Sequence, residues 1–342
     1  MSLYMLEGFE SYGTATGADL ITELSQKWAT SYMDADWATL VDGPSFGTAL
    51  RWENDETYGG LITPIKVANT IVIGFAAKPG SGVSYYNETL IRLMTGVSYQ
   101  GELVLTSTGH LNYYRGASSL LGTTSETLPM GTWTYVELKV YVDNSIGTLD
   151  IHFNGQSVLS LNSIDTLASA ASTITEVQFH PIKYFSIDDI YIYDDIGGVG
   201  SMQGPIAIEQ LLPTGDDTHN WTPSTGANGY EVVDNPEIED TTYISDSTVN
   251  TVELWSYEDL SEIDGAILAA QQHTRAGSDD VGLRTIDIIC ESGATTDSTS
   301  VGLTTDGGFD VIEVIYEDDP NTSSAWTISN LNAANFGVKV GD

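Results

Sequence analysis

The chain has 342 residues, of which 11 are Lys or Arg and 48 are Asp or Glu, so its formal net charge is −37. A protein that binds duplex nucleic acid needs basic residues to displace counterions, and an anionic membrane surface attracts basic segments, so this charge argues against both as partners. Hydrophobic residues make up 41% of the chain, enough to bury a core. The length predicts about two domains.

A single cysteine, Cys290, excludes an internal disulfide, and its apolar surroundings predict a buried structural thiol rather than a nucleophile. Residues 1–10 lack a basic region followed by an apolar one, so we expect no signal peptide. The longest apolar run, Thr70–Ala77, matches one buried strand and is far shorter than the ~20 residues of a membrane span. We therefore expect a soluble chain made in the cytoplasm.

Helical spacing of apolar residues is confined to a few segments. Residues 18–28 predict a helix. Short helical turns are expected at 165–171 and at 329–334, the latter with Ser329 as its N-cap. Elsewhere short β-branched runs alternate with Gly, Asn, Asp, Ser and Thr, which is typical of an all-β protein.

The clearest strand signal lies between residues 133 and 161. Alternation in 133–142 places Val136 on an apolar face and Tyr135 and Glu137 on the opposite face. Asn154-Gly155 favours a tight turn, because both residues tolerate positive φ. This pattern predicts a three-strand meander.

A domain boundary is expected near residue 200. Residues 187–193 read as a closing strand, the stretch after it is rich in Gly, and a new strand is expected at 206–212. The part before the boundary carries a net charge of −14 and the part after it −23. We therefore predict a first domain at 1–197, a linker at 198–204 and a second, acidic β-sandwich at 205–342.

Segments of the first domain carry a family likeness. Gly8–Tyr12 reads as an opening strand that pairs with a closing strand at Phe185–Tyr193. Phe46–Trp52 forms a small loop and then an apolar strand, and Trp133 precedes an alternating strand and an Asn-Gly hairpin at Phe153–Gln156. Together these segments resemble the concanavalin A-like, laminin-G-like jelly roll. The resemblance implies a two-sheet β-sandwich.

The second domain extends the likeness. It begins with Leu211–Asp216 and Trp221–Gly226 and ends with Ala325–Thr327 and Phe336–Val340. Behind a jelly roll, these motifs resemble a two-domain structural protein of tailed bacteriophages. The resemblance implies a non-catalytic virion component, made in the host cytoplasm, that decorates or cements the capsid or belongs to the tail or its fibres. The implied partners are other virion proteins (major capsid or tail proteins), together with further copies of the chain in a homo-oligomer.

The alternative function is recognition of a host-surface glycan by a tail protein. Sugar sites combine aromatic rings with amide or carboxylate side chains, and tyrosine-rich segments offer these components. Ordinary exposed or interfacial tyrosines are the competing interpretation. The candidate glycan-binding residues are Tyr85, Tyr86, Asn87, Tyr113 and Tyr114.

Enzyme motifs are weak. Gly43–Gly47 matches G-x-S-x-G, but a strand pattern follows it and no α/β pattern surrounds it, so a plain turn is expected. A glycosidase of this fold needs two carboxylates across the scissile bond, and the nearest approach, Glu262–Ile267, lacks the final Glu. We therefore predict no enzyme and no catalytic residues.

Metal sites find little support in the sequence. Paired acids suggest calcium, but no pair has EF-hand spacing, so solvated turn acids are the default and a calcium ion bound between loops is the alternative. The five His residues are scattered without metal-ligand spacing, so zinc is not supported, and we expect no metal-binding residue and no cofactor. The acid pairs are Asp188-Asp189, Asp194-Asp195, Asp279-Asp280 and Asp318-Asp319.

Overall fold

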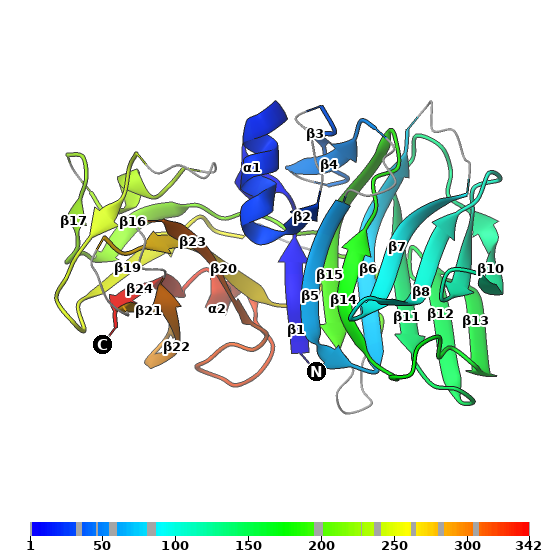
Figure 1. Cartoon of the computed structure of the whole chain (residues 1–342). Helices are drawn as coiled ribbons and strands as arrows, with labels where there is room; N and C mark the ends of the chain where they lie inside the picture. Colours follow the sequence, from blue (N-terminus) through cyan, green and yellow to red (C-terminus); the bar gives the residue numbers. More distant parts are fainter. Residues whose placement is uncertain are drawn as a thin grey trace. The chain divides into compact units, whose positions relative to one another are not determined.

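The computed structural model describes residues 2–31, 36–45, 47–54, 60–80, 87–194, 201–226, 228–235, 241–260, 265–279, 284–303 and 308–341. The chain divides into two compact units, Met1–Ile208 and Glu209–Asp342 (Figure 1). Strands dominate both units, which confirms the predicted all-β class. Within the described residues no helix is long and apolar enough to cross a membrane.

The first unit is a sandwich of two antiparallel sheets (Figure 1). The eight-stranded sheet has the order β13 (Gln156–Ile164), β12 (Gly147–Phe153), β11 (Thr134–Tyr141), β6 (Thr70–Pro79), β15 (Phe185–Asp194), β4 (Thr48–Trp52) and β3 (Ala38–Asp42), with β1 (Ser2–Glu7) paired to β15. The seven-stranded sheet has the order β10 (Ser119–Thr127), β9 (His110–Arg115), β8 (Ser98–Leu105), β7 (Glu88–Thr95), β14 (Ile174–Phe179), β5 (Gly60–Ala68) and β2 (Ala29–Ser31).

One apolar core fills the space between the two sheets. Alternate residues of each strand enter it, so Val136 on β11 is fully buried, as the predicted alternation requires. The rings of Trp28 and Phe75 both meet Phe179 edge-on, with centroids 6.1 and 5.7 Å away. The meander of β11, β12 and β13 is confirmed by their pairing.

The N-terminal segment differs from its prediction in one respect. The opening strand is β1 and ends at Glu7, whereas Glu10–Tyr12 forms a 3-10 turn, because the Glu7 carboxylate accepts the Phe9 N–H at 2.8 Å and ends the strand there. Pairing of β1 with the closing strand β15 is confirmed. The predicted helix is also confirmed, as α1 (Gly17–Lys27).

Of the two predicted helical turns, the first is absent and the second forms. Residues 165–171 contain no helix, because the Thr166 hydroxyl donates to the Tyr141 carbonyl at 2.7 Å and accepts from the Asp143 N–H, which fixes this segment to the end of β11. The turn near residue 329 forms as α2 (Ile328–Leu331). Its N-cap is Thr327, not Ser329, since the Thr327 hydroxyl accepts the Asn330 N–H at 3.2 Å.

Residues 201–208 belong to the first unit and form a strap along its eight-stranded sheet. The Gln203 N–H donates to the Tyr191 hydroxyl at 3.1 Å, and the Gly204 N–H donates to Glu137 Oε1 at 2.9 Å. The Ile208 N–H donates to Asp189 Oδ1 at 2.7 Å. These side-chain partners replace strand pairing, so the expected strand at 206–212 is absent and the boundary lies after Ile208 rather than in a linker at 198–204.

The second unit has two layers of strands. A five-stranded sheet has the order β16 (Pro213–Thr218), β19 (Val252–Tyr257), β24 (Asn335–Val340), β21 (Arg284–Ser292) and β22 (Thr295–Leu303). The ribbon of β20 (Ala270–Gly277) and β23 (Phe309–Tyr316) shares one core with that sheet, and β17 (Thr222–Pro223) pairs with β18 (Ile244–Ser245). The core includes Trp255, Ile288, Val314, Trp326 and Phe336.

The lone thiol lies in this second core, as predicted. Cys290 on β21 is fully buried, and burial, with the nearby acid groups, raises its pKa to about 12. We expect a chromogenic disulfide reagent at pH 8 to leave Cys290 unmodified in the folded protein and to modify it fully in guanidinium chloride. Rapid modification under native conditions would contradict this burial.

Candidate functional site

A line of polar side chains crosses four strands of the seven-stranded sheet. In the strand register, Gln178 on β14 lies opposite Arg92 on β7, Arg92 opposite Glu102 on β8, and Glu102 opposite Tyr114 on β9. Directly opposed residues share one face of a sheet, so the four side chains stand side by side. We call Gln178, Arg92, Glu102 and Tyr114 the polar row.

The polar row lies on the outer face of the sheet. The chain neighbours of its members, among them Phe179, Leu93, Leu103 and Tyr113, point into the core. Because successive side chains alternate between faces, the row members point away from the core. Strand alternation therefore builds a continuous polar surface from residues far apart in the sequence.

An ion pair lies at the centre of the polar row. Arg92 Nε donates to Glu102 Oε1 at 2.6 Å, and the two side chains are 18% and 8% exposed. The guanidinium carbon of Arg92 also lies 4.3 Å from the centroid of the Tyr99 ring. The Arg92 guanidinium and the Glu102 carboxylate are thus held in a fixed orientation, and their opposite charges balance each other.

Further hydrogen bonds fix the β14 side of the row. Gln178 Nε2 donates to Glu176 Oε1 at 2.6 Å, and Gln178 Oε1 lies 3.3 Å from His180 Nε2. Burial, with a smaller effect of the Arg92 charge, lowers the pKa of His180 to about 4. His180 is therefore neutral at pH 7, and it orients the Gln178 amide without adding charge.

The β9 side of the row is fixed in the same way. Thr123 Oγ1 donates to Asn112 Oδ1 at 2.7 Å, and Asn112 Nδ2 donates to the Tyr114 hydroxyl at 3.2 Å. The phenol therefore has a defined position at the end of the row.

A hollow adjoins the row. It has a volume of ≈ 650 Å³ and is lined by Tyr99, Arg115, the β9–β10 turn and residues 167–168. Arg115 forms an ion pair with Asp165 there. We call this the end hollow, and Tyr99 belongs both to its wall and to the surroundings of the polar row.

Only one of the predicted glycan-binding residues lies in the polar row. Tyr114 belongs to it, but Tyr113 is 1% exposed and lies in the core, so its ring is not available to a sugar; that assignment was wrong because adjacent strand residues face opposite ways. Asn87, with φ of 61°, precedes β7 at the end away from the hollow. Tyr85 and Tyr86 lie outside the described residues.

Sequence reasoning missed the other members of the row. Glu176, Gln178 and His180 alternate with Val177 and Phe179, which was a visible sign of a strand with one polar face. The missing information was which strands lie next to β14. Residues 92, 102, 114 and 178 come together only through the observed strand order.

The two enzyme-like motifs fall in different places. Ser45 lies in the turn between β3 and β4, and the Gly43 N–H donates to the Gly47 carbonyl at 3.3 Å, as expected for a plain turn. Glu262 and Asp264 are among the residues that are not described.

The default interpretation of the acid pairs fails at Asp188-Asp189. Both side chains lie on β15 and are only 1% and 3% exposed. Burial and neighbouring carboxylates raise the pKa of Asp188 to about 10, and burial raises that of Asp189 to about 7. Asp319 is also buried and accepts the Asn321 N–H at 2.9 Å. We therefore interpret Asp188, Asp189 and Asp319 as structural acids. Asp195 and Asp280 lie outside the described residues.

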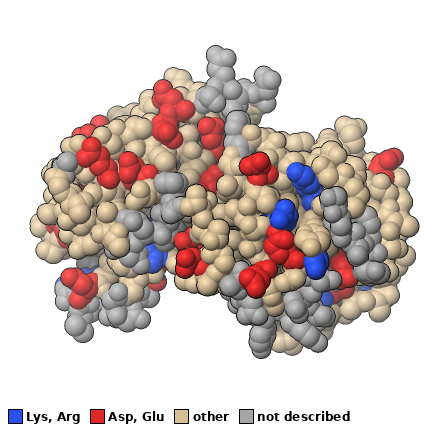
Figure 2. Space-filling view, turned by 90° about the horizontal axis from the view of Figure 1, so that it is seen from above, with Lys and Arg blue, Asp and Glu red and all other residues tan. Residues whose placement is uncertain are grey.

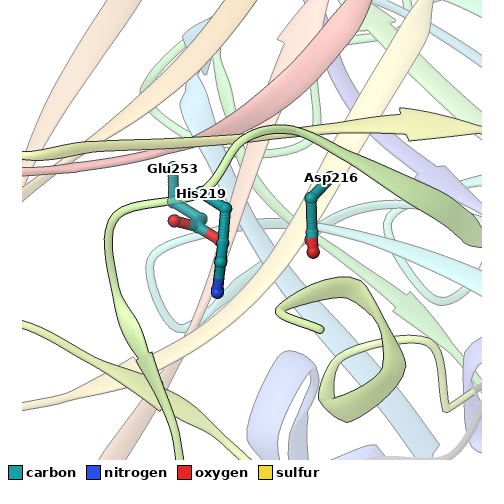
Figure 3. A group of neighbouring side chains, drawn as sticks. All are labelled: Asp216, His219 and Glu253. Atoms are coloured by element: carbon teal, nitrogen blue, oxygen red, sulfur yellow. The ribbon is translucent and has the colours of Figure 1, made fainter. Parts of the chain in front are cut away.

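One histidine has acidic neighbours that the sequence did not reveal. Asp216, His219 and Glu253 place ligand atoms within 4.8 Å of one another in the second unit (Figure 3). His219 Nδ1 lies 2.6 Å from Glu253 Oε1, and Figure 3 shows a ring nitrogen at the outer end of the imidazole. The three groups could supply ligands to a cation.

Hydrogen bonds already occupy these three groups. Glu253 Oε2 accepts the N–H groups of Asn220 and Trp221 at 2.6 and 2.9 Å. The Asp216 carboxylate accepts the N–H groups of Gly229 and Tyr230 at 2.9 and 2.7 Å. A cation would have to compete with these bonds, so we interpret the group as a clamp on two loops.

The clamp predicts a shifted titration of His219. The hydrogen bond to Glu253 raises the His219 pKa, so the stabilisation that protonated His219 provides is complete below about pH 6.5 and is lost as the pH rises through the folded-state pKa. We expect NMR titration to give a His219 pKa above about 6.5 in the wild type. In Glu253→Gln the pKa should fall towards that value, and in the control Glu258→Gln it should stay raised. An identical His219 pKa in all three proteins would contradict the clamp.

No protein-family model and no curated protein matches the sequence. Solved structures do match. Alginate lyase Aly36B aligns at 16% identity over 56% of this chain and 96% of that chain, with a TM-score of 0.40. The cellulose-induced protein Cip1 aligns at 15% identity over 58% and 100%, with a TM-score of 0.39. A sialidase aligns at 13% identity over 57% of this chain and 19% of its own, with a TM-score of 0.41.

These comparisons bear on two predictions. The likeness lies in the β-sandwich fold. Two of these structures are enzymes, an alginate lyase and a sialidase, so the prediction that this chain is not an enzyme is not retained. The names of these three structures do not mention a phage or a virion. The expected virion role, virion partners and homo-oligomer stay predictions.

Proposed function

We propose that this protein binds a saccharide on the outer face of its seven-stranded sheet, across the polar row and the end hollow. The observation that carries the proposal is the register that aligns Gln178, Arg92, Glu102 and Tyr114 on one outward face.

The chemistry of the row suits sugar hydroxyls. A saccharide presents closely spaced hydroxyl groups that both donate and accept hydrogen bonds. The row offers an amide, a guanidinium, a carboxylate and a phenol, which together supply donors and acceptors in a plane. The hydrogen bond between Arg92 and Glu102, and those that join Gln178 to Glu176 and Tyr114 to Asn112, fix these groups before binding. Little side-chain entropy is therefore lost when a ligand arrives.

The end hollow supplies the remaining element of a sugar site. Tyr99 is 42% exposed, so its ring can meet the C–H face of a sugar, as aromatic rings with a polar edge do at binding surfaces. The hollow of ≈ 650 Å³ lies within the range of about 300–1,000 Å³ that is usual for small-ligand sites. A short oligosaccharide could therefore lie along the row and end in the hollow.

A glycan array with the full-length protein tests this proposal. We expect the wild type to bind a defined group of oligosaccharides, and we expect Tyr99→Ala and Tyr114→Ala each to weaken the strongest interaction about tenfold in calorimetry. Tyr243→Ala is the matched control, because Tyr243 is 48% exposed and lies in the second unit. The same mixtures should be assayed for cleavage of the oligosaccharide. No binding to any glycan, or equal affinity in all four proteins, would refute the proposal.

A further inference from the structure

A second row of side chains crosses one end of the eight-stranded sheet. Ser186 on β15 lies opposite Lys78 on β6 on one side and opposite Arg51 on β4 on the other. Their chain neighbours Ala77 and Ile187 point into the core, so Lys78, Ser186 and Arg51 face outward. This row lies on the opposite sheet from the polar row.

Two lysines here lie against aromatic rings. Lys78 Nζ is 5.4 Å from the centroid of the Trp133 ring, and Lys183 Nζ is 5.3 Å from that of Tyr184. Tyr184 is tied to the strand that carries Lys78, because the Gly80 N–H donates to the Tyr184 carbonyl at 2.7 Å. We call Lys78, Lys183, Trp133 and Tyr184 the basic end.

Acids outnumber bases 48 to 11 in the chain, so most lysines would be expected to have an acidic partner. In the part of the chain that the structure describes, neither the Lys78 nor the Lys183 ammonium forms an ion pair. Most other basic side chains do pair with acids, including Lys27, Arg51, Arg92, Arg115 and Lys339. Two lysines without an ion pair among the described residues therefore lie on segments that the hydrogen bond between Gly80 and Tyr184 joins.

The local charge decides what this surface attracts. Figure 2 shows several Lys and Arg side chains over the first unit, with Asp and Glu side chains among them. At physiological ionic strength, charges further than about 8 Å away are largely screened. A single anionic group at the basic end is therefore attracted by the nearby lysines more than it is repelled by the net charge of −37.

We propose that the basic end binds an acidic saccharide, with its carboxylate or sulfate at Lys78 and Lys183 and its sugar ring against Trp133 or Tyr184. The lysine ammonium can pair with an anionic group of the ligand, and the neighbouring aromatic ring can pack against the apolar C–H face of the ligand's sugar ring. Nucleic acid fits less well, because its closely spaced phosphates would continue onto the acidic surface around the two lysines. The site does not depend on the polar row.

Calorimetry with three polymers of related size tests this inference. The probes are oligogalacturonate for carboxylate, dextran sulfate for sulfate, and neutral dextran. We expect the full-length protein to bind at least one acidic probe at 50 mM salt and to ignore dextran. Lys78→Gln and Lys183→Gln should each weaken that binding about fivefold, and the double variant at least tenfold. The control Lys66→Gln removes an exposed lysine of the other sheet and should change nothing.

The outcomes separate the two proposed sites. No binding of either acidic probe, or equal weakening by Lys66→Gln and the basic-end variants, would overturn the basic end. Binding of a single-stranded oligonucleotide that is stronger than that of both acidic probes would also overturn it, in favour of nucleic acid. Failure of the polar row would appear separately, as insensitivity of the array ligand to Tyr99→Ala and Tyr114→Ala.

Discussion

Glu7→Gln should lower the free energy of unfolding by about 3–5 kcal/mol, because it removes a buried charge that several groups share. The Glu7 carboxylate accepts the Phe9 N–H at 2.8 Å and the Tyr12 hydroxyl and Trp28 indole N–H at 3.1 Å each. It also pairs with Lys27 at 3.1 Å, and the two side chains are only 3% and 6% exposed. The variant removes the charged partner that Lys27 has in Glu7, while the Leu6 carbonyl still accepts a hydrogen bond from the Lys27 ammonium at 2.9 Å. Urea unfolding at pH 7 measures the loss.

A matched variant and the pH dependence complete this test. Burial alone would raise the pKa of Glu7, but Lys27 and the hydrogen bonds outweigh it and lower that pKa. The stabilisation by Glu7 is therefore present above its unfolded pKa and is lost as the pH falls through the folded-state value. Glu53→Gln, which breaks the half-exposed pair with Arg51, should cost less than about 1 kcal/mol. Equal losses in the two variants would contradict the role of Glu7.

Glu10→Gln should make the protein more stable at pH 8, by on the order of 3 kcal/mol. Burial, with the Glu7 and Asp189 charges, raises the Glu10 pKa to about 9, and within the described structure Oε1 of Glu10 is buried without a hydrogen-bond partner. The folded wild type therefore keeps a proton that the unfolded chain releases above about pH 4.5. Its stability should fall as the pH rises from there to about 9.

The pH profile checks this second prediction. Urea midpoints between pH 5 and 9 should fall more steeply with pH for the wild type than for Glu10→Gln. Asp188→Asn should reduce the slope as well, because the Asp188 pKa is raised to about 10. A control, Glu126→Gln, should keep the wild-type slope, and identical slopes in all four proteins would contradict the assignment. If calcium instead stabilises the wild type at pH 8 and has no effect on Glu10→Gln, these carboxylates bind a cation.

Local patterns in the sequence predicted the strands but not their neighbours. Alternation around Val136 identified β11 and its core face, and Asn154-Gly155 identified the turn into β13. The same alternation placed Glu137 on the face opposite Val136 but did not predict its full burial, which arises because Gly204 of the strap and Tyr191 both contact it. Such covering depends on where distant segments pack, and no periodicity encodes that.

The candidate site shows the same limit. Tyr114 was identified from its residue type. Arg92, Glu102 and Gln178 could be identified as candidates only from the strand order, which places β14, β7, β8 and β9 side by side. Tyr113 was wrongly included because residue type was given more weight than alternation. Asp188 shows a related failure, since an acid pair inside an apolar strand was read as solvated although its neighbours Ile187 and Ile190 are core residues.

A crystal structure of the protein with the oligosaccharide that binds most strongly on the array tests the saccharide proposal most directly. The account predicts a sugar chain across β14, β7, β8 and β9, with hydroxyl groups within hydrogen-bonding distance of Arg92, Glu102 or Tyr114 and one sugar ring against Tyr99. A structure with no sugar on this face would contradict the account, whether or not a sugar lies elsewhere on the chain.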